Sequence, residues 1–254
     1  MTLELEFKII DETEDYIVVD KPAPMLVHPS KPGHSRTLLD YLKQLLAYEM
    51  ANGAKLSIIN RLDRETSGLV LVAKKTATAR LFSRAMERRQ VIKEYLCLVW
   101  GWPPKDHFSV EMPIARQGDF QHSHIWLKQM VHPQGSFAAT EFSVEERLLL
   151  ETSNGRRFSV LRARPITGRT HQIRVHLASI GYPVVGDKIY TAGGRQYLEF
   201  IQTGWTAALE KSLLLQRLGL QSVLLRFGPA SGYCCEWQIG LDSQLRSWLD
   251  AHRA

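Results

Sequence analysis

Residues 60–73 read NRLDRETSGLVLVA, a polar loop that runs directly into an apolar segment. The final LVLVA is typical of a buried β-strand. In the loop, Asp63 lies between Arg61 and Arg64, and nearby cations favour the ionised carboxylate that a nucleophile or an electrostatic stabiliser requires. On local chemistry alone, an exposed Asp–Arg salt bridge remains the better interpretation, because such neighbours are common and contribute little.

The segments on either side predict an α+β protein with a mixed, largely antiparallel sheet flanked by helices. Trp102-Pro103-Pro104 is a strong breaker, so we expect two halves, roughly 1–102 and 105–254, of one catalytic domain, 1–254. Strands are expected at 5–10, 16–20, 69–73, 93–101, 137–150, 157–164, 221–227 and 233–239. Helices are expected at 37–50, at 76–90 with Thr76 as cap, and from a Thr170 cap to Gly181, with a loop and a short helix at 191–216.

Composition narrows the class of protein only weakly. The 254 residues carry a net charge of +6, which fits a polyanionic partner but also suits many plain enzymes. Three cysteines without a CxxC pair argue against a disulfide framework and a zinc finger, and no apolar run approaches a membrane span. We therefore expect a cytoplasmic protein. His122, His124 and His132 lack an accompanying carboxylate or cysteine set, so no metal is expected.

A second group of polar residues lies in RPITGRTHQIRVHLASIGYPVVGD, residues 164–187. Gly168 and Thr170 predict backbone amides at a helix N-terminus, where a phosphate could bind, and Arg169 and His171 add donors there. Arg174 flanks the buried side of the predicted helix, and an arginine in such a position usually has a carboxylate partner. Asp63 is the candidate partner.

Together these segments resemble the RluA-type pseudouridine synthases, which modify ribosomal or transfer RNA. The family's H-R-L-D-x-x-T-S-G block corresponds to residues 60–68, and its tyrosine block resembles residues 93–96. Its third block, T-G-R-x-H-Q-I-R-x-H followed by G-x-P-x-x-G-D, is met by residues 167–176 and 181–187. The opening EDYIVVDKPAPMLVHP is also similar. The resemblance extends from about residue 12 to about 190, and more loosely to 240.

The resemblance implies a pseudouridine synthase fold with an active-site cleft between its halves, and isomerisation of specific uridines in structured RNA. Asp63 would act on the ribose so that the uracil detaches, turns and rejoins through its carbon 5. Tyr95 would stack on the base and help remove the carbon 5 proton, and Arg174 would orient Asp63. Arg61 would fill the space left by the flipped-out nucleotide. The reaction implies no cofactor and no metal, and the partner would be rRNA or tRNA, not a membrane.

Further RNA contacts are predicted on the helix at 76–90. Its arginines recur every four residues with Glu87 as the one interleaved carboxylate, which favours phosphate binding over a merely solvated face. These are Arg80, Arg84 and Arg88. No separate N-terminal RNA-binding appendage is expected, and a monomer is the default.

Two departures from the family pattern stand out. Asn60 replaces the usual histidine and is expected to be a hydrogen-bonding neighbour, not a proton carrier. Gln221 stands where a histidine is frequent, which predicts altered loop packing. A catalytically inactive RNA-binding module would have lost Asp63 or Arg174, and a nucleoside hydrolase would show paired carboxylates. Incubation with free uridine distinguishes the two enzymes. A hydrolase would release uracil, whereas an RNA isomerase would leave the nucleoside unchanged.

Overall fold

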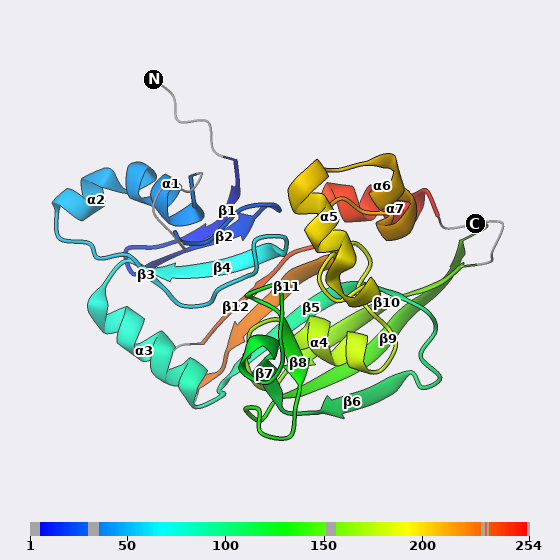
Figure 1. Cartoon of the computed structure of the whole chain (residues 1–254). Helices are drawn as coiled ribbons and strands as arrows, with labels where there is room; N and C mark the ends of the chain where they lie inside the picture. Colours follow the sequence, from blue (N-terminus) through cyan, green and yellow to red (C-terminus); the bar gives the residue numbers. More distant parts are fainter. Residues whose placement is uncertain (1–5, 30–35, 151–155, 230–231, 233, 253–254) are drawn as a thin grey trace. The chain divides into compact units, whose positions relative to one another are not determined.

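The computed structural model describes residues 6–29, 36–150, 156–229, 232 and 234–252 (Figure 1). The chain forms two compact units: unit 1 comprises Met1–Lys93 and Gln221–Asp242, and unit 2 comprises Glu94–Leu220 and Ser243–Ala254. The halves expected at 1–102 and 105–254 therefore do not match the units. The proline pair at 103–104 lies inside unit 2, and the late strands at 221–239 belong with the N-terminal ones because they pair there.

Unit 1 is built on a mixed sheet in the order β1-β2-β4-β11, with β3 paired to β4 and β12 paired to β11. Its strands are β1 (Lys8–Glu12), β2 (Tyr16–Lys21), β3 (Ser57–Ile58), β4 (Ser67–Ala73), β11 (Leu220–Phe227) and β12 (Cys235–Gln238). Its helices are α1 (Leu38–Leu45), α2 (Ala47–Ala51) and α3 (Thr76–Glu87). Every residue of β4 is buried, which confirms the strand expected from LVLVA. This strand pairs antiparallel with β2 and parallel with β11.

The core of unit 1 is rich in aromatic rings. Tyr16 packs edge-on against Trp237 at 5.2 Å between ring centroids, and Phe82 of α3 lies 4.7 Å from Phe227 of β11. Such pairs add about 0.5–1.5 kcal/mol each beyond their buried area. Helix α3 is thereby fixed to the sheet through its apolar side, and its charged side faces solvent.

Unit 2 contains an antiparallel sheet in the order β5-β10-β9-β6, and a separate hairpin, β7-β8 (Figure 1). Its strands are β5 (Val91–Trp100, which begins in unit 1), β6 (His107–Glu111), β7 (Ile114–Arg116), β8 (Gln129–Val131), β9 (Ala139–Leu150) and β10 (Arg156–Pro165). Its helices are α4 (Gln172–Ser179), α5 (Arg195–Thr203), α6 (Ala207–Leu213) and α7 (Ser243–Asp250). Ile173 and Leu177 of α4 join Cys97 and Leu161 of the sheet in one core.

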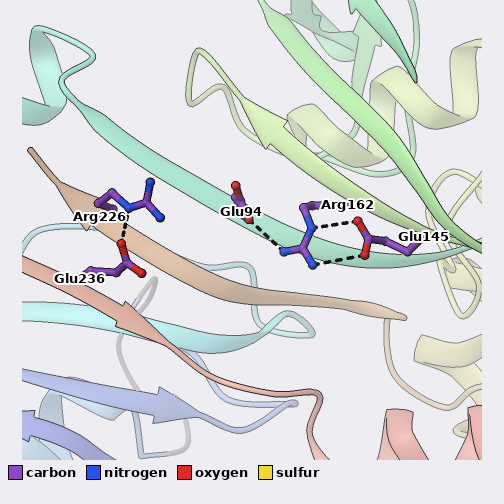
Figure 2. Close-up of polar contacts among 5 residues, drawn as sticks. All are labelled: Glu94, Glu145, Arg162, Arg226 and Glu236. Atoms are coloured by element: carbon purple, nitrogen blue, oxygen red, sulfur yellow. Dashed lines mark hydrogen bonds and ion pairs between the residues drawn. The ribbon is translucent and has the colours of Figure 1, made fainter. Parts of the chain in front are cut away.

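Cross-strand ion pairs stabilise both sheets (Figure 2). Arg162 of β10 binds Glu94 of β5 at 2.9 Å and Glu145 of β9 at 3.0 Å. These two carboxylates raise the pKa of Arg162, and the largest cause is the hydrogen bond that Arg162 donates to Glu145. In unit 1, Arg226 of β11 pairs with Glu236 of β12. All these side chains are partly exposed, so each pair contributes little, about 0–1 kcal/mol.

The boundaries of several helices differ from those expected. The helix expected at 37–50 is divided at Leu46, and α3 has Lys75, not Thr76, at its N-cap. Residues 191–216 hold two helices, α5 and α6, where a loop with one short helix was expected, and the hairpin β7-β8 was missed. The first residues of the strands expected at 5–10 and 233–239 lie outside the described residues. No described helix is both long and apolar enough to span a membrane.

Candidate active site

Asp63 lies in the loop between β3 and β4, and its side chain is partly exposed. The amide of Thr66 donates to the Asp63 carbonyl at 3.1 Å and closes a turn. Leu62, the preceding residue, is buried and anchors the loop to the core, whereas Arg61 and Arg64 are exposed. The loop therefore presents a carboxylate between two exposed arginines, and the catalytic role of Asp63 stays a prediction.

A fully buried lysine, which the sequence analysis missed, fixes this loop. The ammonium of Lys21 at the end of β2 donates to the carbonyls of Pro22 (2.9 Å), Met25 (2.8 Å) and Arg64 (3.4 Å). The Met25 amide also donates to the Arg64 carbonyl, at 2.9 Å. A buried charge is tolerated only when polar groups satisfy it, so Lys21 ties the backbone beside Asp63 to β2. The sequence shows only a lysine at the end of an apolar strand, and this pattern does not predict the three carbonyl groups that accept from it.

Asn60 and Gly68 fix the two ends of the loop. The Asn60 amide donates to the Leu69 carbonyl at 2.9 Å, and its oxygen accepts from the Leu71 amide at 2.8 Å. Asn60 is thus the hydrogen-bonding neighbour that was expected. Gly68 has φ +109°, and a Cβ there would lie 2.1 Å from the Ser222 carbonyl oxygen. Only glycine meets both conditions.

Gln221, the second departure from the family pattern, holds a neighbouring loop. Its side-chain oxygen accepts from the Asp242 amide at 2.9 Å, and its nitrogen donates to the Gly240 carbonyl at 3.1 Å. The Asp242 carboxylate in turn accepts from Ser67 at 2.8 Å. Gln221 is completely buried, so its role in unit 1 is to connect the start of β4 to the chain after β12.

Arg174 in unit 2 is a buried residue of α4 with a carboxylate partner, as expected, but the partner seen here is Asp187. Its Nε donates to Oδ2 at 2.7 Å and its Nη2 to Oδ1 at 3.0 Å, a bidentate pair. Oδ1 also accepts from the amides of Ile189 and Tyr190 at 2.9 and 3.1 Å. Asp187 is the last residue of the segment 181–187 that resembles the family, but the segment alone did not predict that Asp187 pairs with Arg174.

The electrostatics of Asp187 favour its ionised form. Burial raises its pKa, but the charge and hydrogen bonds of Arg174, together with the two backbone amides, outweigh burial and bring the pKa below its ordinary value. The Tyr190 ring lies 5.1 Å from the Arg174 guanidinium, and the Tyr190 hydroxyl is 2.8 Å from Nδ1 of His171. Arg174 is therefore held on several sides and has little freedom to reorient.

The N-cap of α4 lies one residue beyond the Thr170 cap that was expected. Helix α4 begins at Gln172, after His171 adopts a left-handed conformation with φ 55°. The Arg169 amide donates to the Gln172 side-chain oxygen at 3.0 Å, so this amide is already occupied. The Arg169 amide thus serves an internal hydrogen bond of unit 2, and phosphate binding by the amides of this segment stays a prediction.

Those bonds continue into a buried polar chain. Gln172 donates to Thr140 at 2.9 Å, the Thr140 hydroxyl lies 3.0 Å from Nδ1 of His176, and Nε2 of His176 lies 3.0 Å from the Met112 carbonyl. A carbonyl only accepts, so Nε2 carries the proton and Nδ1 accepts from Thr140. Burial lowers the pKa of His176, and this neutral form suits the arrangement.

The remaining predicted site residues are distributed over both units. Tyr95 on β5 is half-buried against the core of unit 2, on the opposite side of the strand from Glu94. Asp63 and Arg61 belong to unit 1, whereas Tyr95 and Arg174 belong to unit 2. The meeting of Asp63 with Tyr95 and Arg174 stays a prediction.

The basic residues of α3 all reach solvent. We call Arg80, Arg84 and Arg88 the arginine row; they are exposed, and none has an ion pair with a described residue. Arg169 is exposed and donates through Nε to the Phe137 carbonyl at 3.1 Å, while His171 is half-buried beside Tyr190.

Residues 15–179 match the RNA pseudouridylate synthase family. The ribosomal large subunit pseudouridine synthase D of Pasteurella multocida is 31% identical over 252 residues, covering 98% of this chain and 72% of that protein. The Haemophilus influenzae protein of that name is 32% identical, with the same coverage. Among solved structures, human RNA pseudouridylate synthase domain containing 1 superposes with a TM-score of 0.67 at 25% identity, covering 100% of this chain and 98% of that one.

The fold and the family match thus define an RNA-modifying isomerase. The chain belongs to the RluA-type family of RNA pseudouridine synthases. Its reaction is the isomerisation of uridine to pseudouridine in RNA. This result confirms the resemblance, the fold class and the enzyme class inferred from the sequence.

Proposed function

We propose that this enzyme modifies a uridine of large-subunit ribosomal RNA and that Asp63 is its catalytic carboxylate. The observation that carries the assignment is the anchoring of the Asp63 loop. Lys21 and the Met25 amide both bind the Arg64 carbonyl, while Asp63 itself keeps partial exposure. A rigid backbone under an accessible carboxylate is what an enzyme needs to place one reactive oxygen against a ribose. Relatives named for the large ribosomal subunit support rRNA over tRNA.

In the proposed reaction the Asp63 carboxylate attacks C1′ of the ribose or assists elimination from it, and the bond from C1′ to N1 of the uracil breaks. The detached uracil turns and its C5 forms the new bond to C1′; in the attack route this breaks the bond from C1′ to the Asp63 oxygen and releases the carboxylate, and in the elimination route the ribose regains the proton that Asp63 removed. The proton on C5 leaves with help from the Tyr95 hydroxyl, and N1 gains a proton. Atoms and electrons balance within the nucleotide, so the proposal invokes neither a cofactor nor a metal.

Arg174 is proposed to pair with Asp63 and orient its carboxylate. The guanidinium of Arg174 already donates to Asp187 through Nε and Nη2. A guanidinium carries five N–H donors, so a bidentate bond to Asp187 leaves donors for a second carboxylate. Asp187 would then be a positioning residue that acts through Arg174.

RNA binding is assigned to exposed cations. Arg61 would occupy the space of the flipped-out target nucleotide, whose extrusion costs a few kcal/mol and least in a loop. The arginine row, Arg169 and His171 would contact phosphates of the structured RNA. We further propose that the enzyme is a cytoplasmic monomer.

Pseudouridine mapping tests the proposed function. Total RNA is compared from cells with this protein, without it, and with Asp63→Asn in its place. We expect loss of one or more pseudouridines from large-subunit rRNA in both altered strains, because the Asn variant keeps the loop shape but lacks the negative charge. Loss confined to tRNA would contradict the substrate, and full modification by Asp63→Asn would contradict the catalytic assignment.

A second variant tests the base-contacting residue. Tyr95→Phe keeps the ring for stacking and removes the hydroxyl, so RNA affinity should stay near wild type while isomerisation becomes very slow. Wild-type turnover by this variant would leave Tyr95 as a packing residue of β5.

A further inference from the structure

The hairpin β7-β8 carries a loop that is rich in aromatic side chains. We call residues 116–132 the aromatic loop; it contains Phe120, His122, His124, Trp126 and His132. The loop is closed at its base by the Gln117 amide, which donates to the Lys128 carbonyl at 2.8 Å. Ile125 is buried within it, and Lys128 donates to the Gly193 carbonyl at 2.7 Å. The aromatic side chains therefore project from an anchored scaffold.

Two of these rings are exposed although burial would be favourable. Trp126 keeps 75% of its surface in solvent and Phe120 keeps 41%. Exposed large aromatic side chains on an anchored loop commonly mark a binding surface. Neither ring is needed for the core of unit 2, whose buried members come from the sheet and α4.

Each exposed ring already has one flat partner. The Arg116 guanidinium lies 3.9 Å from the centroid of the Trp126 ring and is held there by an ion pair with Asp119. His132 stacks on Phe120 with 3.8 Å between ring centroids and 28° between the planes. Planar groups at this spacing are already in contact. A nucleobase would therefore add to the outside of such a stack as one more layer.

The charge of the loop favours an anionic partner. Asp119 is its one carboxylate and is already paired with Arg116. Lys128 and three histidines add cationic or donor groups, and the exposed Arg169 donates to the carbonyl of Phe137, a third exposed ring. A protein or lipid surface needs no such pairing of flat rings with guanidinium, whereas single-stranded RNA offers both bases and phosphates.

We propose that the aromatic loop binds unpaired nucleotides of the RNA substrate, with bases stacked on Trp126 and Phe120 and phosphates near Arg116. The proposal rests on the proposed function in so far as the substrate is RNA, and it adds a site in unit 2 built from residues outside the predicted catalytic set. It would favour RNA substrates that contain an unpaired stretch.

Fluorescence anisotropy tests this site with two labelled RNA strands of about ten nucleotides. One has mixed bases, and the other has the same phosphates with abasic sugars at every position. Trp126→Ala should raise the Kd for the strand with bases by about 5- to 150-fold, the loss expected for one stacked base. It should change the Kd for the abasic strand less than about twofold and leave the salt slope unaltered, because stacking releases no counterions.

Tyr48→Ala is the matched control, since Tyr48 is 80% exposed on α2 of unit 1. It should bind both strands as wild type does, and Trp126→Phe should recover part of the loss. The proposal is overturned if Trp126→Ala and Phe120→Ala bind the strand with bases normally, or lose the same factor on both strands. Formation of pseudouridine in rRNA by the wild type is scored separately, so failure of this site and failure of the proposed function give different results.

Discussion

The buried pair of Arg174 and Asp187 allows a quantitative test of stability. In Arg174→Met, Asp187 loses both bonds to the guanidinium and keeps those from the amides of Ile189 and Tyr190. Breaking a buried ion pair costs about 3–5 kcal/mol. The two remaining amide bonds favour the lower end, about 3 kcal/mol. At about 2–4 °C per kcal/mol for a chain of this length, the thermal midpoint should fall by about 6–12 °C.

The loss should also depend on pH in a defined direction. In the wild type, the pKa of Asp187 lies below its ordinary value of about 3.9, so the pair stabilises the fold fully above that pH and less as pH falls through the folded pKa. In Arg174→Met the arginine no longer opposes the effect of burial on Asp187, so the pKa of Asp187 rises above that in the wild type. Protonation then relieves the unpaired charge. The difference in midpoint between the two proteins should therefore be largest near pH 7 and shrink toward pH 4.

The assay is a thermal melt of Arg174→Met, Asp187→Asn and the double variant across that pH range, followed by circular dichroism. The double variant should be more stable than the sum of the single losses predicts, because the second change removes the stranded charge. Strictly additive losses, or a midpoint difference that is constant with pH, would refute the reasoning.

Three further outcomes are expected. Replacing the arginine row with glutamates should lower the log–log salt slope of RNA binding by roughly 0.7–0.9 for each lost phosphate contact, and an unchanged slope would make the row a solvated face. Gly68→Ala should lower the free energy of unfolding by at least about 2 kcal/mol through backbone strain and the clash with Ser222, more than Gly53→Ala, where φ is also positive but the space is open. Below its ordinary pKa of about 6.5, neutral His176 should cost the wild type up to about 1.4 kcal/mol of stability per pH unit as pH falls, because the unfolded chain binds the proton first. A His176→Asn variant should show a shallower decline in chemical denaturation between pH 6.5 and 5, and equal slopes would contradict this.

Much of the fold could be predicted from residue patterns. The apolar run at 69–73 and the alternation of residue types at 157–164 are local patterns typical of strands, and both strands are present. The hairpin β7-β8 was missed because each strand has three residues, which is too short for alternation to be visible. The start of α4 was misplaced because Thr170 resembles a cap, whereas the chain turns through the left-handed His171.

The site divides in the same way between local and distant information. The loop around Asp63 was visible because its residue types are adjacent in the chain. The contact of Lys21 with Arg64 joins residues 43 positions apart, and a single sequence does not reveal such long-range pairings. For Arg174, burial on one face of a helix correctly indicated a carboxylate partner. The identity of Asp187 depended on the path of the chain after α4, which periodicity does not determine.

The division of the chain into units has a consequence for synthesis on the ribosome. Ser67 and Gly68 pair with Gln221 and Ser222, and β12 pairs with β11, so the sheet of unit 1 lacks two strands until residues 220–238 have been synthesised. At about 5–20 residues per second, the residues between Lys93 and Gln221 take roughly 6–25 s to emerge. During that interval β4 exposes an apolar edge, while most of unit 2 is already contiguous. A premature stop between residues 180 and 219 would therefore leave the sheet of unit 1 without β11 and β12 while sparing the whole family-matched segment, residues 15–179.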